Sequence, residues 1–346
     1  MAARSTIAKI GQKANFKKAV TWGTAVNANV SGAGLNFKNI SGVICSKDYY
    51  PLVEVDMPIA QFAYLGADQP LDLSITTDML YSPGALGTMM AMLFGTAGSP
   101  SGAGDAKKHT IKFNSSTAGL FGTLAIGVPG QIWEIPSVKP YSWSLKASAG
   151  GLIESEIKAY GNKLVAPAST TNGDLETATY DDRDNRLLFH QATLYVNDYD
   201  SEGSLTTTHR VNSFEFSFVR SMKAEMAIGD TYCVEPVEAE QAKFSLKVGF
   251  PRYDTNTASL LSKMYSETYQ MGKLIFEGAT ISGDDKYTLT LWFPYMKIKP
   301  FGVQYEDVIK TEIEFDLLKA SAAPTGFPDS MPALVLINKR TIDYLG

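Results

Sequence analysis

Strict alternation of apolar and polar residues is the dominant pattern along the chain. In SFEFSFV, residues 213–219, a phenylalanine stands at every second position with a polar residue between each pair. KFSLKV at 243–248 and LDLSIT at 71–76 follow the same rule. Successive side chains of a strand point to opposite faces, so this period predicts half-buried strands with one polar face. Turn signals such as GDD at 283–285 separate these stretches, which predicts a mainly β, antiparallel fold.

Two stretches have helical spacing instead. PGALGTMMAMLFG at 83–95 starts with a proline that a first helical turn tolerates and ends with a glycine. TASLLSKMYSET at 257–268 places Leu260, Leu261 and Met264 on one helical face. We predict helices over Pro83–Phe94 and Thr257–Thr268, each packing its apolar stripe on the strands that surround it in sequence.

The chain also repeats itself. The order strand, short helix, strand, Lys-Pro-aromatic segment, final alternating strand occurs twice. Val138-Lys139-Pro140-Tyr141 matches Ile298-Lys299-Pro300-Phe301, and Glu156-Ile157 matches Glu312-Ile313. The shared order indicates an internal duplication, hence two tandem β-sandwich domains with one short flanking α-helix each.

The composition suggests where these domains begin and end. We predict a basic N-terminal arm over 1–34, a first β domain over 35–165, a linker over 166–186, a second β domain over 187–320 and a C-terminal extension over 321–346. The linker is rich in Thr, Asn, Asp and Ala without apolar period, which predicts a flexible connection. The extension ends in a short apolar run after three prolines, which predicts an added edge strand.

The totals describe a folded protein of ordinary charge. Of 346 residues, 45% are hydrophobic and 19% charged, which argues against general disorder. A formal net charge of -5 excludes the strongly basic field typical of a nucleic-acid binder. No carboxylate precedes Asp48, yet the start lacks the features of a presequence, and no apolar run of signal-peptide or membrane-spanning length is found. Cys45 and Cys233 are too few for a disulfide framework.

The sequence offers no constellation that would carry catalysis. Its three histidines, His109, His190 and His209, have no metal-ligand spacing, and the common phosphate-binding and nucleophile motifs are absent. DYDSEG, from Asp198, imitates the start of a calcium loop, but His209 stands where the bidentate acid belongs. An acidic hairpin connection explains this segment better. We therefore expect no enzyme activity, no metal and no cofactor.

Carboxylates on the polar faces of the strands are the candidate functional residues. In KTEIEFD at 310–316, three acids stand opposite Ile313 and Phe315 with neighbours about 6.6 Å apart. Like charges so placed repel and gain nothing for folding. This face is either an ordinary solvated surface or an acidic wall that repels something negatively charged. Its candidate residues are Asp72, Glu154, Glu156, Glu215, Glu312, Glu314 and Asp316.

Several segments together resemble the tail tube proteins of long-tailed bacteriophages. The resemblance rests on TWGTAVN at 21–27, TTDMLYSPGALGTMMAMLFGTAG at 76–98, KKHTIKF at 107–113 and IPSVKPYSW at 135–143. The resemblance covers most of residues 10–165. It extends to the second half of the chain because that half repeats the first. These motifs are aromatic and glycine positions without catalytic residues.

The resemblance implies a structural virion protein. Such proteins form rings of six β-sandwich domains that stack into a hollow tube, and the inner wall is a continuous β-barrel with polar, often acidic, side chains. A duplicated chain would supply six domains from three copies. The implied partners are copies of the chain itself, a tape-measure protein, and tail terminator or tip proteins, with DNA passing through during ejection. The implied location is the tail of the virion, after assembly in the host cytoplasm and without a membrane.

A different class of function remains open from the residues. Two β-sandwich domains also suit a binding module of the carbohydrate-binding or adhesin type. That alternative predicts a monomer with aromatic residues exposed in a groove, whereas the tube predicts rings or filaments.

Overall fold

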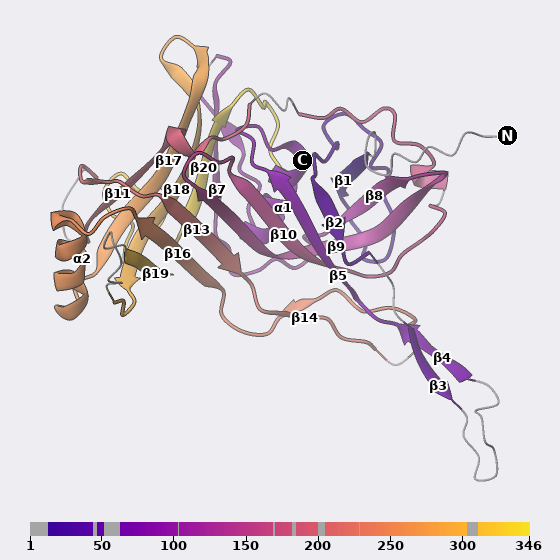
Figure 1. The fold of residues 1–346 in the computed structure, drawn as a ribbon. Helices are drawn as coiled ribbons and strands as arrows, with labels where there is room; N and C mark the ends of the chain where they lie inside the picture. Colours follow the sequence, from indigo (N-terminus) through magenta and orange to yellow (C-terminus); the bar gives the residue numbers. More distant parts are fainter. Residues whose placement is uncertain are drawn as a thin grey trace.

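The structure is a computed structural model that describes residues 13–43, 47–51, 63–102, 104–168, 170–181, 185–199, 205–227, 229–302 and 311–346. It is mainly β, with 46% of residues in strands and 9% in helices, which confirms the predicted fold class. Sixteen strands belong to one sheet in which every pairing is antiparallel (Figure 1).

In the described residues, the first half of the chain contains ten strands and one helix. The strands are β1 (Ala14–Lys18), β2 (Asn39–Ser41), β3 (Lys47–Pro51), β4 (Ala63–Asp68), β5 (Leu71–Asp78), β6 (Pro100–Ser101), β7 (Lys107–Lys112), β8 (Gly122–Val128), β9 (Gln131–Ser148) and β10 (Glu154–Gly161). Helix α1 (Gly84–Phe94) lies between β5 and β6. Short 3-10 turns at Thr170–Asn172 and Phe189–Gln191 lie between the halves.

The second half contains the remaining ten strands and helix α2 (Thr255–Tyr265), between β16 and β17. The strands are β11 (Ala192–Asp198), β12 (Thr208–His209), β13 (Ser213–Val219), β14 (Met222–Lys223), β15 (Val237–Glu238), β16 (Lys243–Phe250), β17 (Gln270–Ser282), β18 (Asp285–Ile298), β19 (Thr311–Leu318) and β20 (Ala333–Asn338).

The two halves arrange their main strands in the same spatial order. In the first half the order is β1-β8-β9-β10-β5-β2. In the second half it is β11-β17-β18-β19-β16-β13. Each position is filled by the strand at the corresponding place in the sequence, and each helix follows the corresponding strand, β5 or β16.

The halves join edge to edge through β9 and β13. Seven residues of each strand pair, from Ser148 with Ser213 to Ser142 with Val219. The core continues across this junction as one cluster of buried side chains. Phe94 of α1 contacts Trp143 of β9 and also Phe218 of β13, with ring centroids 6.2 and 4.8 Å apart. The molecule therefore has one shared core, where the sequence predicted two tandem sandwiches; the domain boundaries remain predictions.

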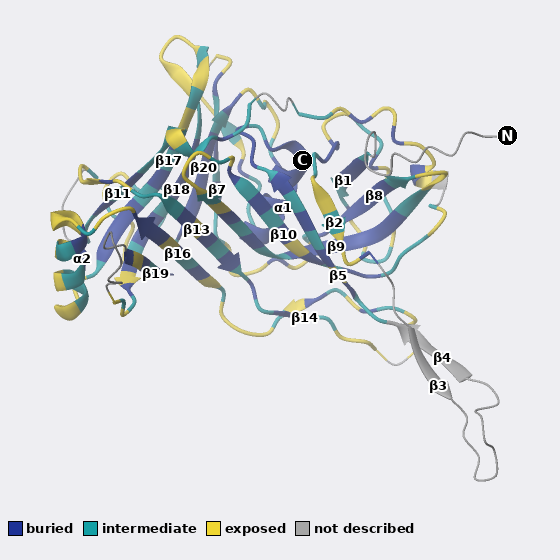
Figure 2. Ribbon diagram, viewed as in Figure 1, coloured by how far each residue is buried: buried dark blue, intermediate teal, exposed yellow. Residues whose placement is uncertain are grey.

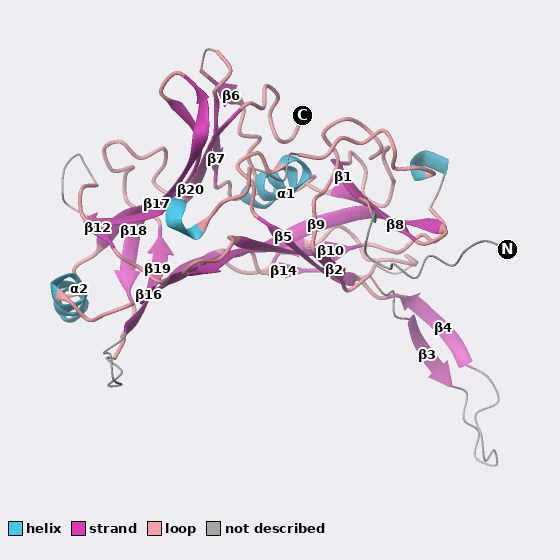
Figure 3. Cartoon of the chain, turned by 45° about the horizontal axis from the view of Figure 1, so that its top comes forward, coloured by secondary structure: helices cyan, strands magenta, loops and turns pink. Residues whose placement is uncertain are grey.

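Helix α1 lies over the apolar face of the sheet (Figure 3), and all of its residues are buried. It packs against β9, β1 and β7, so its surroundings cover it on several sides. The helix begins one residue after the predicted Pro83 and ends where predicted. Gly95 stops it in the left-handed conformation (φ 92°), which glycine adopts without penalty.

Helix α2 lies at the far end of the second half and is largely exposed (Figure 2). The Asp254 side chain accepts hydrogen bonds from the backbone N–H groups of Asn256 and Thr257 and so starts the helix two residues before the predicted position. Only Thr257 and Leu260 are buried. The prediction that Leu261 is core is wrong, since the helix packs against β18 with one narrow stripe.

Three of the predicted connecting segments are integrated into the fold. β1 lies inside the predicted N-terminal arm and pairs with β8, because Ala14 and Phe16 are core residues. Asn172, in the predicted flexible linker, is buried and binds the backbone of Val26 and Ala28. In the C-terminal extension, β20 pairs with β18 on one side and β7 on the other, so it is an interior strand and not the predicted edge.

Arg220 ties the two halves together at the end of α1. Its guanidinium is fully buried and donates to the carbonyl oxygens of Leu93, Phe94 and Asn114 at 2.6, 3.1 and 2.6 Å. It also binds the Glu238 carboxylate at 2.6 Å. Burial lowers the pKa of Arg220, and Glu238 opposes that shift. A planar group with five donors suits this task because it satisfies several carbonyls at the negative end of a helix at once.

We expect Leu93→Ala in α1 to lower the free energy of unfolding by about 2–5 kcal/mol, because it removes a fully buried side chain. Leu261→Ala in α2 is the matched control and should cost below about 1 kcal/mol, because that side chain is only partly buried. Urea unfolding of both variants measures the difference. Equal losses would contradict the distinction between a buried and a surface helix.

Replacing Arg220 by Met should destabilise the protein by about 2–4 kcal/mol, because three carbonyls and the Glu238 carboxylate lose their shared donor. The exposed Arg252→Met is the control and should leave the thermal midpoint nearly unchanged. If both variants melt at the wild-type temperature, Arg220 does not hold the halves together.

Candidate functional site

The candidate site is the polar face of the sheet that the two halves form together. Core side chains alternate with polar ones on β5, β10, β9, β13, β16 and β19. The pairing registers place the polar residues of all six strands on the same side. The seven carboxylates predicted from the sequence all lie on this face, although they come from strands up to about 240 residues apart. We refer to it below as the polar face.

Acids and lysines alternate across the strands of the polar face. Glu154 of β10 stands opposite Lys146 of β9, which stands opposite Glu215 of β13. Glu215 in turn faces Lys247 of β16, and Lys247 faces Glu314 of β19. We call these five residues the charge ladder. Opposite charges on directly paired positions favour this register of the strands.

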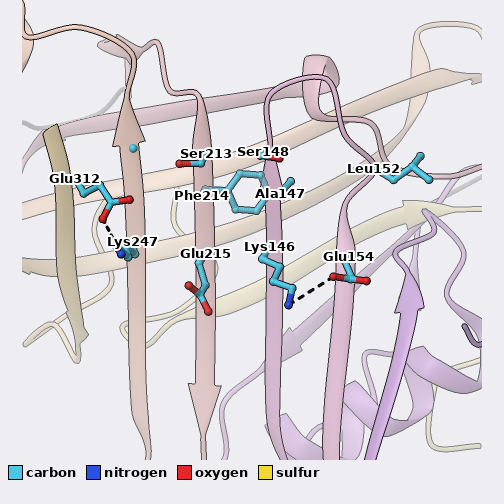
Figure 4. A pocket seen from close by; sticks show the side chains of 11 residues that line it. Lys146, Ala147, Ser148, Leu152, Glu154, Ser213, Phe214, Glu215, Lys247 and Glu312 are labelled. Carbon is cyan, nitrogen blue, oxygen red and sulfur yellow. Dashed lines mark ion pairs between the residues drawn. The ribbon is translucent and has the colours of Figure 1, made fainter. Parts of the chain in front are cut away.

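Ion pairs join the two lysines of the charge ladder to acids on neighbouring strands (Figure 4). The ammonium of Lys146 lies 3.5 Å from Glu154, and that of Lys247 lies 2.7 Å from Glu312, the next acid along β19. These groups border a shallow hollow of about 350 Å³ at the β9–β13 junction. The side chains of Lys146, Lys247 and Glu312 are 48%, 47% and 61% exposed, so water screens each pair and single pairs contribute little.

Lys299, just beyond β18, is held by two acids of β19. Its ammonium lies 2.6 Å from Glu314 and 3.1 Å from Asp316. Hydrogen bonds to these carboxylates raise the pKa of Lys299, and a hydrogen bond to Glu312 raises the pKa of Lys247. Both shifts favour the charged amine in the folded state. Their stabilising effect is therefore present below the ordinary value of 10.5 and is lost as pH rises above it.

The remaining predicted acids bind hydroxyl groups. Asp72 accepts a hydrogen bond from the Tyr141 hydroxyl at 2.8 Å, and Glu156 accepts one from Ser74 at 2.6 Å. Tyr141 stacks on Tyr160 with ring centroids 4.6 Å apart. Burial and the bond to Asp72 both raise the pKa of Tyr141, so the phenol stays neutral. This end of the polar face is aromatic and hydroxyl-rich.

The polar face carries charges of both signs, whereas the sequence left open an ordinary solvated surface or an acidic wall; that the seven acids line a channel stays a prediction. Lysines stand among the seven acids: Lys146, Lys158, Lys243 and Lys247 come from the same strands, Lys297 from β18, and Lys299 from just beyond it. Between them lies a row of small hydroxyls in which Ser144, Ser217 and Ser245 are paired neighbours. Alternation within KFSLKV already put Lys243 and Lys247 on the polar face. Their position opposite particular acids depends on the strand register, which the sequence does not reveal.

The other candidate residues do not join this face into a reactive centre. His109 is buried between the carbonyl oxygens of Gly98 and Arg340, at 2.7 and 2.9 Å, and burial lowers the pKa of His209. Within the described ranges, no group of three or more His, Cys, Asp and Glu side chains is arranged to hold a metal ion. Cys45 and the centre of the calcium-like segment, residues 200–204, lie outside the described residues. The flanks of that segment are strands β11 and β12, as expected for a hairpin.

Neither a scan against models of known protein families nor a search of the curated proteins finds a match for this chain. In the part of the chain that the structure describes, no helix has the length and apolar character needed to cross a bilayer. The function proposed below therefore rests on the strand arrangement and on the polar face.

We expect Glu215→Lys to lower the free energy of unfolding by about 0.2–1 kcal/mol in low salt, because it places a third positive charge between Lys146 and Lys247. Glu215→Gln, which removes the charge without reversing it, should cost less. In concentrated salt the difference between the two variants should shrink. A difference that is the same at both salt concentrations would show that the rungs of the charge ladder are not electrostatically coupled.

Proposed function

We propose that this protein is a structural subunit that assembles with copies of itself into stacked rings, forming the hollow tail tube of a long-tailed bacteriophage. The observation that carries the proposal is the junction of two halves with the same strand order into one sheet. This arrangement supports an internal duplication. It also provides, within one chain, an example of how one half attaches to the next.

The same attachment repeated between chains would close a ring. β13 gives one edge to β16 and the other to β9 of the first half. Its counterpart β2 pairs with β5 and stands at the end of the strand order. Open strand edges invite pairing with another chain, and a head-to-tail contact closes when the rotation per step divides a full turn. If each half is one step of about 60°, three chains complete the ring.

In such a ring the polar face would line the channel, since the apolar face is covered by α1 within the chain. A channel wall with both charges also suits DNA, although it does not repel DNA as the predicted acidic wall would. Non-specific DNA binding requires lysines and arginines that neutralise phosphates. Here Lys146, Lys247 and Lys299 are each held by a carboxylate. The wall would then neither attract DNA strongly nor exclude it.

The proposal includes the partners that the resemblance implies. A tape-measure protein would lie in the channel, and terminator or tip proteins would cap the tube. These contacts, and a location in the virion tail after assembly in the host cytoplasm, follow from the tail tube proposal. As a tail tube subunit the protein would have no catalytic role.

One observation favours the binding module as a second candidate. Tyr199, Tyr269 and Tyr295 form an aromatic cluster, with Tyr295 ring centroids 4.7 and 4.5 Å from the other two. Tyr199 and Tyr295 of this cluster border an open hollow of about 550 Å³ together with Lys319 and Ser321. Partly exposed aromatic rings beside polar groups are suited to stacking on a sugar. This candidate predicts a monomer that binds oligosaccharides and loses binding in Tyr295→Ala.

Electron microscopy of the purified chain should show rings or tubes with a central channel and sixfold appearance. Native mass spectrometry should give three chains per ring, because each chain supplies two similar halves. A protein that stays monomeric at every concentration would overturn the tube and favour the binding module. Six chains per ring would keep the tube but contradict the role of the duplication.

A further inference from the structure

His109 of β7 is a buried histidine that lies between two hydrogen-bond acceptors. Its side chain is fully buried. Nδ1 lies 2.7 Å from the carbonyl oxygen of Gly98, and Nε2 lies 2.9 Å from that of Arg340. A carbonyl oxygen only accepts hydrogen bonds, whereas a neutral imidazole has one N–H and one bare lone pair. Both contacts are therefore hydrogen bonds only when the ring of His109 is doubly protonated and positively charged.

The carbonyl of Arg340 belongs to a segment that returns to helix α1. This segment, residues 339–346, follows β20 and lies beside α1 (Figures 1 and 3); we call it the latch. Its Tyr344 side chain is buried, and the Tyr344 N–H donates to the carbonyl oxygen of Ala97 at 2.9 Å. Gly87 of α1 leaves room for the Tyr344 ring, because a Cβ at this position would lie 2.3 Å from the nearest ring atom. The latch thus covers the helix with one aromatic side chain.

The contacts of His109 oppose the cost of burying its charge. Hydrogen bonds from a charged donor are about twice as strong as neutral ones, and this ring makes two of them. The centres of the His109 and Tyr344 rings lie 5.1 Å apart, within the range of a cation–π attraction. Loss of one proton would leave a nitrogen lone pair facing a carbonyl oxygen, so one buried hydrogen bond would be lost and the two acceptors would repel.

The strands and the helix packed around His109 place no charge against it. β6 and β20 flank β7, and their residues opposite His109 are Pro100 and Leu336. No residue of α1 is ionisable. The described ionisable residues of the adjoining segments are Lys108, Asp181, Lys339, Arg340, Asp343 and Tyr344.

Among these groups, three interact with one another at the latch. The Arg340 guanidinium donates to the backbone carbonyl of Asp343 at 3.1 Å and lies 4.6 Å from the centre of the Tyr344 ring. Burial raises the pKa of Asp181 to about 6, with Arg340 opposing the shift, so this carboxylate is ionised above neutral pH. Burial also raises the pKa of Tyr344, which keeps its phenol neutral. Between about pH 7 and about pH 9, His109 is therefore the group of this site that can change its charge.

We infer that the latch is a pH-dependent switch, which is closed over α1 while His109 is doubly protonated and opens when the ring loses a proton. An exposed histidine loses its second proton at about pH 6.5. Above that value, opening the latch releases a proton, so a rise in pH favours the open state. Below it both states hold the proton, and further acid gives no additional stabilisation. The switch would operate in a free chain as well as in an assembly.

Hydrogen exchange of the Tyr344 amide measures opening of the latch, because this N–H is bonded to Ala97. Between about pH 7 and about pH 9, its protection factor, corrected for the intrinsic pH dependence of exchange, should fall by up to about tenfold per pH unit, the effect of one released proton. The Arg220 amide, bonded to the carbonyl oxygen of Tyr141, is the internal control and should keep its protection. An equal loss at both amides would be global unfolding and would contradict a local switch.

Three variants assign the pH dependence to one side chain. His109→Gln is neutral at every pH and should show low protection of the Tyr344 amide without a pH slope. His190→Gln, at an exposed histidine, is the matched control and should behave like wild type. Asp181→Asn removes the buried carboxylate and should keep the slope. A slope that persists in His109→Gln would overturn the inference.

If His109→Gln fails to fold, nitrogen NMR of the wild-type protein with labelled histidine decides. The chain has three histidines, and His190→Gln and His209→Gln assign their signals. Both ring nitrogens of His109 should carry protons wherever the Tyr344 amide is protected, and the second proton should be lost over the same pH range as the protection. A neutral His109 ring in a closed latch, or an open latch with a doubly protonated ring, would show that the two events are not linked and that the latch is no switch.

Discussion

The pairing of β9 with β13 is the interaction on which the rest of the structure depends. It turns two half-sheets into one, with Ser144 directly opposite Ser217. A shift by one residue would turn Phe216 away from Trp143 and out of the shared core, and it would break the alternation of charges on the opposite face. The core and the polar face are thus two consequences of the same strand pairing.

The two ends of the molecule differ because only one half has a neighbour in the chain. The first half receives β13, Arg220 from the segment that follows β13, and β20, and its helix is consequently buried all round. The second half receives no such cover from the described residues, and α2 keeps Tyr265 in solvent. A repeating assembly of chains with two similar halves leaves one half of each chain without a neighbour from its own chain. This asymmetry supports self-association more directly than the charge of the polar face does.

Charge on the polar face has to be considered in pairs. The acids alone suggest a repelling wall. Lysines whose side chains point to the same side of the sheet convert it into a surface of short-range ion pairs. Such a surface has little field beyond a Debye length of about 8 Å, so it neither draws in nor rejects a polyanion at a distance. Its stability contribution is correspondingly small, and the fold depends on the aromatic core and on Arg220 instead.

The sequence by itself determined the elements whose signal is local. Alternation assigned Phe214, Phe216 and Phe218 to the core, helical spacing located both helices, and strand parity put the seven acids on polar faces. The sequence misjudged the burial of Leu261 and of the connecting segments, because burial there depends on contacts with segments that are distant in the chain. Tertiary structure alone decided that the halves share one sheet, that lysines stand opposite the acids and that Arg220 ends α1. The shared sheet and the bonds from Arg220 to backbone carbonyls join residues more than 60 positions apart, and the lysine–acid pairs depend on strand register, which no local pattern encodes.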